Sequence, residues 1–157
     1  MQRLLILRHA HSEPAGPQGD RSRLLSARGH AQCEEVLAFL NARDLVPDAV
    51  VCSPARRTRE TWDRISSVAP DAELSQPDGL YLGDTDAYEG AIAAADAPTV
   101  LLIGHNPTCA ALVGGLSGAA ELDPMIAKGR FPTASLCVAA VDGRSRVAQS
   151  LFMPERG

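Results

Sequence analysis

Arginine and histidine side chains follow three apolar segments of the chain. Arg8 and His9 end the first segment, Arg57 lies shortly after the second, and His105 follows the third. The planar guanidinium group of arginine can bind two oxygens of an anion at once. A neutral imidazole has a free lone pair near neutral pH and can act as a nucleophile or a base. These residue types indicate an anion site with the groups that phosphoryl transfer requires: cations around the equatorial oxygens and an in-line nucleophile.

Arg8 and His9 could also simply end a strand at the surface, so the hypothesis depends on the three segments meeting. Each segment is a short, continuous apolar run, which is typical of strands buried on both faces of a parallel sheet. The carboxyl ends of parallel strands lie at one edge of the sheet, where α/β proteins bind their ligands. We therefore expect the three polar groups to open on one crevice. The apolar runs are residues 4–7, 49–52 and 99–103.

Capping residues predict helices between these strands. Ser26 stands before an amphipathic segment, and Ser53 and Asn106 each stand directly before a proline, which suits the first turn of a helix. Arg57 then lies in the first turns of its helix, where a cation opposes the positive end of the helix dipole and suggests a bound anion. The expected helices are residues 26–43, 54–69, 87–95 and 107–116.

The last part of the chain has a different pattern. Residues 134–141 and 146–153 flank an Asp-Gly-Arg-Ser turn, which predicts a β-hairpin because Asp-Gly adopts the positive φ that such turns need. Residues 114–130 predict a loop, and whether residues 116–131 act as a lid stays open. We expect one domain over residues 1–157: an α/β three-layer sandwich with a central, mostly parallel sheet, helices on both faces and a C-terminal β-hairpin.

Composition narrows the function classes. The formal net charge of −4 gives no overall basic field to attract nucleic acid. No apolar stretch reaches the length of a membrane span, and the first residues do not resemble a signal peptide. The cysteines form no C-x-x-C pair, which disfavours a zinc site or a disulfide framework. We expect a cytoplasmic monomer with free thiols and without nucleic-acid or membrane partners. The cysteines are Cys33, Cys52, Cys109 and Cys137.

Four short motifs follow one another along the chain. They are Leu7-Arg8-His9-Ala10, Leu25-Ser26-Ala27-Arg28-Gly29 with Gln32, Ser53-Pro54-x-x-Arg57-x-x-x-Thr61, and Gly104-His105-Asn106. In this order they resemble the histidine phosphatase superfamily, the phosphoglycerate mutase-like proteins. The small size and the Asp20-x-x-Arg23-x-Leu25 approach to the first helix are most similar to the SixA-type phosphohistidine phosphatases of that superfamily.

The resemblance implies roles for these residues and no cofactor. His9 would be the nucleophile that becomes phosphorylated, and Arg8, Arg57 and His105 would surround the phosphate. Ser12 and Asn106 would add polar groups to the phosphate site. No metal is expected, because a site built from His9, His11 and His105 would place a cation beside arginines.

The sequence departs from the family pattern in three places. An asparagine that often follows the signature histidine by several residues is replaced near Ala15, in a rearranged loop. The glycine of the signature is Ala10, and the glutamate that serves many relatives as general acid falls on Leu82. Asp84 is the preferred substitute, ahead of Asp86 and Glu89. The alternative is that no strong acid is needed, because the imidazole leaving group of phosphohistidine requires less proton assistance than an alkoxide does.

The missing acid favours phosphohistidine or an otherwise activated substrate, and it disfavours a sugar-phosphate mutase. The leading hypothesis is a metal-independent phosphatase that forms phospho-His9 and dephosphorylates phosphohistidine in proteins. A small-molecule phosphomonoesterase with the same residues is the first alternative, so the expected partner is a phosphorylated protein or a small phosphorylated substrate. A non-catalytic phosphate-binding domain that uses Arg8 and Arg57 is the second alternative.

Overall fold

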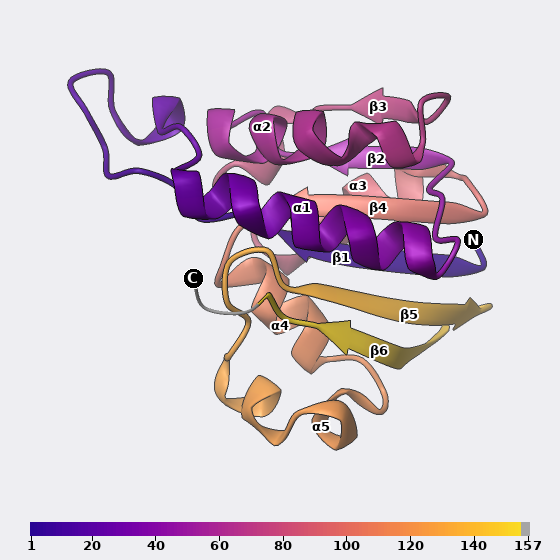
Figure 1. Cartoon of the computed structure of the whole chain (residues 1–157). Coiled ribbons are helices and arrows are strands. Elements are labelled where there is room, and N and C mark those ends of the chain that lie inside the picture. Colours follow the sequence, from indigo (N-terminus) through magenta and orange to yellow (C-terminus); the bar gives the residue numbers. More distant parts are fainter. Residues whose placement is uncertain (155–157) are drawn as a thin grey trace.

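Six strands form one mixed sheet in the order β3-β2-β4-β1-β5-β6. The computed structural model describes residues 1–154. Strands β3, β2, β4 and β1 run parallel, and β5 and β6 are antiparallel at one edge (Figure 1). The elements are β1 (Arg3–Arg8), α1 (Ala27–Ala42), β2 (Ala49–Cys52), α2 (Arg56–Ile65), β3 (Glu73–Ser75), α3 (Thr85–Ala95), β4 (Thr99–Gly104), α4 (Thr108–Gly114), α5 (Ala119–Leu122), β5 (Leu136–Asp142) and β6 (Ser145–Phe152), with short 3-10 turns η1 (Asp20–Ser22), η2 (Ser66–Val68), η3 (Asp78–Leu80) and η4 (Pro124–Lys128).

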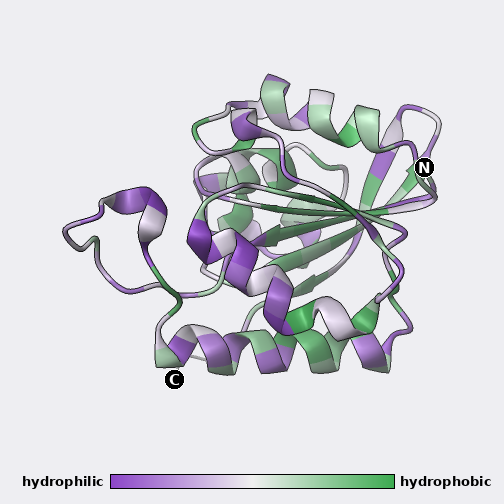
Figure 2. Ribbon diagram, turned by 90° about the horizontal axis from the view of Figure 1, so that it is seen from above, coloured by the Kyte–Doolittle hydropathy of each residue, from purple (hydrophilic) through white to green (hydrophobic). Residues whose placement is uncertain are grey.

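Helices cover both faces of the sheet. Side chains alternate along a strand, so Leu5 and Leu7 of β1 pack in the core beneath α1 and α2, and Leu4 and Ile6 pack in the core beneath α3 and α4. Figure 2 shows apolar strands between helices whose outer faces are hydrophilic. Burial on both faces explains why the strands read as continuous apolar runs. The predicted three-layer α/β sandwich is confirmed.

The chain reverses direction at a hairpin after the parallel strands. Strands β5 and β6 pair antiparallel around the predicted turn, where Gly143 has a φ of +60°. Strand β5 also pairs antiparallel with β1, the strand that ends at Arg8, directly before His9. The segment between β5 and α4 therefore passes beside the carboxyl end of β1, where the backbone N–H of Ala134 donates to the carbonyls of both residues at 3.1 and 3.0 Å.

The segment predicted as a loop over residues 114–130 contains two short helical turns. Gly118, with a φ of +81°, opens α5, and the Asp123 carboxylate accepts the Met125 N–H at 2.9 Å to cap η4. Ala119 and Ile126 are buried in the core beneath α3 and α4, so packing holds turns that have no amphipathic period. Within residues 1–154, no helix combines the length and the apolar character needed to cross a bilayer.

Candidate active site

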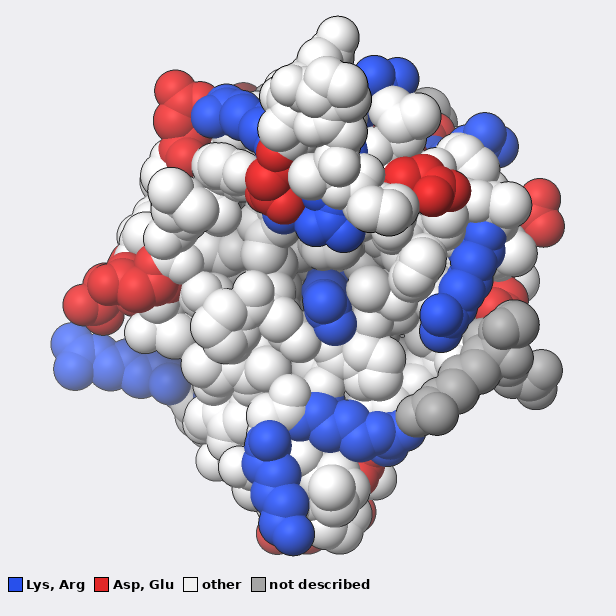
Figure 3. All heavy atoms as spheres, turned by 90° about the vertical axis from the view of Figure 1, so that its left-hand side faces the viewer, with Lys and Arg blue, Asp and Glu red and all other residues white. Residues whose placement is uncertain are grey.

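The three predicted polar groups lie at the carboxyl edge of the parallel strands. His9 directly follows β1, His105 follows β4, and Arg57 is in the first turn of α2. The rings of His9 and His105 have centroids 5.4 Å apart, and Arg57 Nη2 is 3.3 Å from His105 Nδ1. Figure 3 faces this edge and shows basic surface near its centre with acidic surface beside it. The structure thus brings these side chains together as the parallel-strand argument requires.

One ring nitrogen of His9, Nδ1, is fixed by a hydrogen bond, and Nε2 takes no part in that bond. Its Nδ1 is 2.7 Å from the carbonyl oxygen of Ala10, and because a carbonyl can only accept, Nδ1 must carry the proton. The Nε2 lone pair is therefore available for attack. Burial lowers the pKa of His9 to about 3, with nearby Arg57 and Arg8 acting in the same direction, so the ring is neutral at neutral pH.

Ala10, which replaces the glycine of the family signature, fits this backbone. It lies outside the positive-φ residues of the chain, is fully buried, and its N–H donates to Thr61 Oγ1 at 3.0 Å. Its carbonyl holds Nδ1 of His9. The position uses the backbone of Ala10 and does not need the conformational freedom of glycine.

His105 is held between an arginine and a serine. Arg57 Nη2 can only donate, so Nδ1 of His105 accepts and Nε2–H donates to Ser53 Oγ at 2.7 Å. Burial lowers the pKa of His105 to about 4, and the charge of Arg57 adds to this effect. The backbone N–H of His105 donates to Tyr88 Oη at 3.0 Å. The ring and its backbone are thus positioned by α2, β2 and α3 together.

Ser53 does not have the helix-capping role that its place before Pro54 predicted. Helix α2 begins at Arg56, with Ala55 at the cap position and no side-chain capping bond. The Ser53 hydroxyl instead holds His105. By contrast, Ser26 caps α1 as predicted, accepting the Gly29 N–H at 3.0 Å.

Two arginines contribute donors to the site. Arg8 Nη1 donates to the Phe131 carbonyl at 3.1 Å, and Arg57 Nη1 donates to the Asp20 carbonyl at 3.0 Å. The Nε atoms of Arg8 and Arg57 are both buried without a hydrogen-bond partner among the residues that the structure describes. A bound phosphoryl oxygen would satisfy such donors, which are costly to bury unpaired.

The other predicted phosphate-binding residues have structural contacts. Asn106 Nδ2 donates to the Phe131 carbonyl at 2.8 Å, and its Oδ1 accepts the Ala110 N–H at 3.2 Å. Asn106 thereby joins the start of α4 to the carbonyl that Arg8 also contacts. Ser12 is buried and pairs through its backbone with Leu25, where the loop after β1 closes on itself. Their phosphate contacts stay a prediction.

The predicted acid lies at the start of a helix. Asp84 is exposed, and its carboxylate accepts the Ala87 N–H at 3.0 Å as the N-cap of α3. Leu82, where the resemblance places the family acid, has 88% of its surface exposed. Asp84 thus has a structural task, and its role as general acid stays a prediction.

Sequence reasoning assigned no site role to Asp20, Tyr81 and Tyr88. Asp20 contacts Arg57, Tyr81 donates to Asp20, and Tyr88 accepts from the His105 backbone. The Asp20-x-x-Arg23-x-Leu25 pattern was a signal for the first of these, but nothing in it says that the loop returns to Arg57. The tyrosines are isolated in the sequence and leave no spacing signal.

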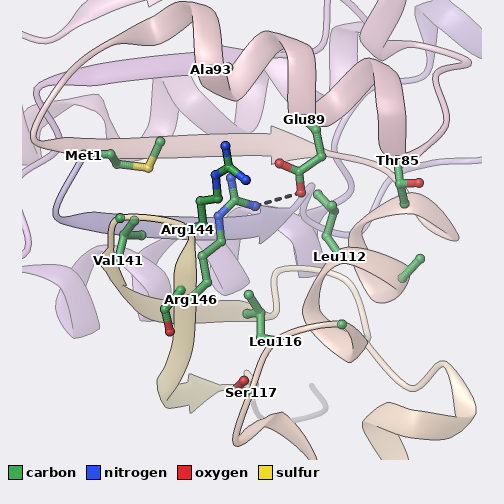
Figure 4. Close-up of a pocket in the computed structure, with 14 residues that line it drawn as sticks. Met1, Thr85, Glu89, Ala93, Leu112, Leu116, Ser117, Val141, Arg144 and Arg146 are labelled. Carbon is green, nitrogen blue, oxygen red and sulfur yellow. Dashed lines mark hydrogen bonds and ion pairs between the residues drawn. The ribbon is translucent and has the colours of Figure 1, made fainter.

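A hollow of about 1000 Å³ lies away from these residues, between α3, α4 and the β5-β6 hairpin. Arg146 reaches across it to Glu89 at 2.7 Å, and Arg144 extends into the same space (Figure 4). Its lining contains none of the histidines, so we place the chemistry at the strand ends. In the part of the chain that the structure describes, no three His, Cys, Asp or Glu side chains are grouped to hold a metal ion.

Comparison with known proteins identifies the family. The sequence model of the histidine phosphatase superfamily (branch 1) matches residues 4–91, which include Arg8, His9 and Arg57. The uncharacterized protein Rv1276c of Mycobacterium tuberculosis is 31% identical over 138 residues, which cover 85% of this chain and 87% of the relative. The uncharacterized protein ML1117 of Mycobacterium leprae is 29% identical over 144 residues, with coverage of 85% and 88%.

Solved structures agree with this assignment. A chain from Agrobacterium tumefaciens, provisionally named as the phosphohistidine phosphatase SixA, has a TM-score of 0.85 at 28% identity over 98% of both chains. A SixA from Nakamurella multipartitia, also provisionally named, has a TM-score of 0.82 at 28% identity over 98% of this chain and 96% of that one. The protein histidine phosphatase SixA in complex with tungstate shares the fold, with a TM-score of 0.77 at 21% identity over 96% of both chains. The chain therefore belongs to the histidine phosphatase superfamily.

Proposed function

We propose that this chain is a phosphatase that passes a phosphoryl group from phosphohistidine in proteins to His9 and then to water. The observation that carries the proposal is the fixed tautomer of His9, whose Nδ1–H is held by the Ala10 carbonyl at 2.7 Å. A buried, neutral imidazole with a free Nε2 is the nucleophile that such a reaction needs.

The first step forms one bond and breaks one. Nε2 of His9 attacks phosphorus, the bond to the leaving group breaks, and its electron pair goes to the leaving atom. His9 becomes a phosphorylated imidazolium whose Nδ1–H still donates to Ala10. Arg8 and Arg57 bind the equatorial oxygens, where negative charge lies in the transition state.

The second step restores the nucleophile. Water attacks phosphorus in line with Nε2, the P–N bond breaks, and its electron pair returns to Nε2. Inorganic phosphate leaves, and the proton of the water goes to phosphate or to solvent. The anionic phosphoryl group favours protonation of His105 on Nδ1, which can then donate to a phosphoryl oxygen once Arg57 Nη2 turns to the phosphate.

Two features support a phosphohistidine substrate. Leu82 stands at the acid position and Asp84 caps α3, so the described site offers no carboxyl group in contact with the nucleophile that would protonate an alkoxide. An imidazole leaves from phosphorus without strong proton assistance. The SixA names among the similar structures agree with this substrate class. We propose that no metal takes part, because Arg8 and Arg57 already supply the cations, and activity should survive a chelator.

Trapping the intermediate tests the proposal. Wild-type protein mixed with ³²P-labelled phosphoramidate and denatured in alkali should carry label that is stable to base and released by acid. His9→Ala should carry no label and show no turnover. His30→Gln, at a half-buried position of α1 outside the proposed site, is the matched control and should label normally. Retained turnover in His9→Ala would refute the proposal.

A substrate panel then separates the alternatives. A protein phosphatase of this kind should prefer a phosphohistidine-carrying protein over sugar phosphates and nucleotides in kcat/KM. A higher value on a small phosphomonoester would favour the small-molecule enzyme. Binding of phosphate without turnover of p-nitrophenyl phosphate would favour the non-catalytic domain.

A further inference from the structure

The carboxylate of Asp20 lies beside the arginine proposed to bind phosphate. Its Oδ2 is 3.2 Å from Arg57 Nη2 and also accepts the Tyr81 hydroxyl, and its Oδ1 is 3.1 Å from Arg23 Nη1. About half of the Asp20 side chain is exposed, at 49%, whereas Arg57 is only 8% exposed. Asp20 therefore stands at the mouth of the site, in front of a buried cation.

The contacts of Asp20 leave one acceptor position open. Each carboxylate oxygen can accept about two hydrogen bonds. Oδ2 accepts from Arg57 and Tyr81, and Oδ1 accepts from Arg23. Oδ1 thus has a further lone pair on an exposed, well-anchored group. A donor on the part of the substrate beyond the phosphate could bind there.

Asp20 can accept such a hydrogen bond but cannot act as a general acid. The Tyr81 hydrogen bond, together with Arg23 and Arg57, lowers the pKa of Asp20 to about 2. The carboxylate is therefore ionised wherever the enzyme is folded under ordinary conditions. The charged and titratable groups that face it are Arg23, Arg57, Tyr81 and His105, whose pKa the Asp20 charge raises.

We propose that Asp20 selects the leaving group, by accepting a hydrogen bond from the ring N–H of the phosphorylated imidazole, on the nitrogen that does not carry phosphorus. This inference rests on the proposed function. The contact stabilises the imidazolium form of the substrate. When the P–N bond breaks, its electron pair stays on the nitrogen that carried phosphorus, and a neutral imidazole leaves with the proton already on its other nitrogen. The substrate thereby brings the proton that a general acid supplies to other leaving groups.

The same carboxylate disfavours oxygen leaving groups. A phosphomonoester leaving oxygen gains negative charge in the transition state, and a fixed anion at the mouth repels it. Polyanionic substrates such as nucleotides meet the same repulsion. Figure 3 shows acidic surface directly beside the basic surface at this edge of the sheet. Asp20 is therefore a specificity-determining residue for nitrogen-linked phosphate.

The test compares nitrogen-linked with oxygen-linked substrates. Asp20→Asn should lower kcat/KM on phosphoimidazole by about 10- to 100-fold, the effect of losing one hydrogen bond to a charged group. On p-nitrophenyl phosphate the same variant should stay within about 3-fold of wild type or improve. Asp78→Asn is the matched control. Asp78 is 91% exposed and pairs at 3.4 Å with Arg21, the neighbour of Asp20 in the chain. This variant should leave the ratio of kcat/KM on phosphoimidazole to kcat/KM on p-nitrophenyl phosphate unchanged.

A second substrate tests the contact without a variant. N-phospho-N′-methylimidazolium has the same ring charge but a methyl group in place of the N–H. The kcat/KM of wild type should be about 10- to 100-fold higher on phosphoimidazole than on the methylated substrate, and Asp20→Asn should lose this preference. The descending limb of kcat against pH on phosphoimidazole should also move to lower pH in Asp20→Asn, because the carboxylate no longer favours the protonated ring in the enzyme–substrate complex.

Different outcomes would overturn the role of Asp20 and the proposed phosphatase activity. Equal losses on both substrate classes in Asp20→Asn would mean that Asp20 only positions Arg57, and would overturn this inference while leaving the phosphatase in place. A wild type without turnover on either class would overturn the proposed function, and the inference with it.

Discussion

Replacing Gly104 by alanine should damage both stability and the site. Gly104 is the last residue of β4, directly before His105. A Cβ at this position would lie 2.6 Å from Cε2 and Oη of Tyr88 and 2.9 Å from its Cζ. Tyr88 is 1% exposed, and its hydroxyl accepts the His105 N–H at 3.0 Å. The ring cannot move aside without breaking that bond or displacing the core beneath α3.

Two terms set the size of the effect. Overpacking a well-packed core destabilises by roughly 1–3 kcal/mol, and losing the bond between Tyr88 and His105 adds about 0.5–1.5 kcal/mol. We expect Gly104→Ala to lower the free energy of unfolding by about 2–4 kcal/mol, and Tm by roughly 5–15 °C for a chain of this size. Since His105 would shift with its backbone, kcat/KM on phosphoramidate should fall at least about 10-fold.

Urea unfolding and calorimetry measure the stability, and a matched glycine controls for the residue type. Gly90 lies on the same helix as Tyr88, is exposed, and has nothing within 4 Å of a built Cβ. Gly90→Ala should therefore stabilise the protein by about 0.5–1 kcal/mol. In a Tyr88→Leu background, Gly104→Ala should destabilise less than it does alone. A Gly104→Ala variant within about 0.5 kcal/mol of wild type, or one unaffected by that background, would refute the steric argument.

Three further predictions follow from the site. The folded pKa values of His9 and His105, about 3 and about 4, lie below the ~6.5 of the unfolded chain. The unfolded state therefore binds more protons, so the contribution of these rings to the free energy of unfolding is fully present above pH 6.5 and is lost as pH falls toward 4. Urea titrations should show the free energy of unfolding falling by about 1.4 kcal/mol per pH unit for each ring. His9→Ala should show a correspondingly smaller slope. Ser53→Ala removes the acceptor of His105 Nε2–H and should lower kcat about 10-fold with KM nearly unchanged. A ¹⁵N spectrum of the ring should then show mixed tautomers of His105. An unchanged spectrum would contradict this positioning role of Ser53. Asp84→Asn preserves the cap of α3 and should leave kcat on alkyl and aryl phosphates within about 3-fold of wild type; a selective 100-fold loss on alkyl phosphates would instead identify Asp84 as the acid.

The sequence predicted the features that depend on a local physical constraint, such as burial of a strand on both faces or the positive φ of a turn. Strands buried on both faces must be apolar at every position, so residues 4–7 and 99–103 revealed β1 and β4, and with them the edge where Arg8 and His105 lie. Asp142-Gly143 revealed the hairpin because few residues adopt its turn. Parallel topology then placed His9 and His105 at one edge of the sheet, and the pairing of β1 with β4, which the sequence did not predict, sets them side by side.

The features that the sequence did not predict depend on where a loop lies in space. The segment between β1 and α1 has no hydrophobic period, and nothing in it indicates that Asp20 returns to Arg57 or that Tyr81 meets it there. Ser53 before a proline is a good capping sequence, yet its hydroxyl bonds a ring brought in from β4. Local propensity could not distinguish these uses, because the competing partner is distant in the sequence.

Burial keeps His9, the proposed nucleophile, neutral, and it also strengthens the positive field that we propose Asp20 reduces. Removing His9 from water keeps the ring neutral, but the same low-dielectric surroundings strengthen the fields of Arg8 and Arg57. Such a site would bind any phosphate well, including its own product. An anion at the mouth, outside the buried pocket, reduces the field there without changing the tautomer of His9. It weakens the attraction for polyanions and for product phosphate, and it rewards a substrate that carries its own proton. Asp20 is half exposed beside an arginine that is almost fully buried, and from this position a single carboxylate would alter selectivity while leaving the proposed nucleophile intact.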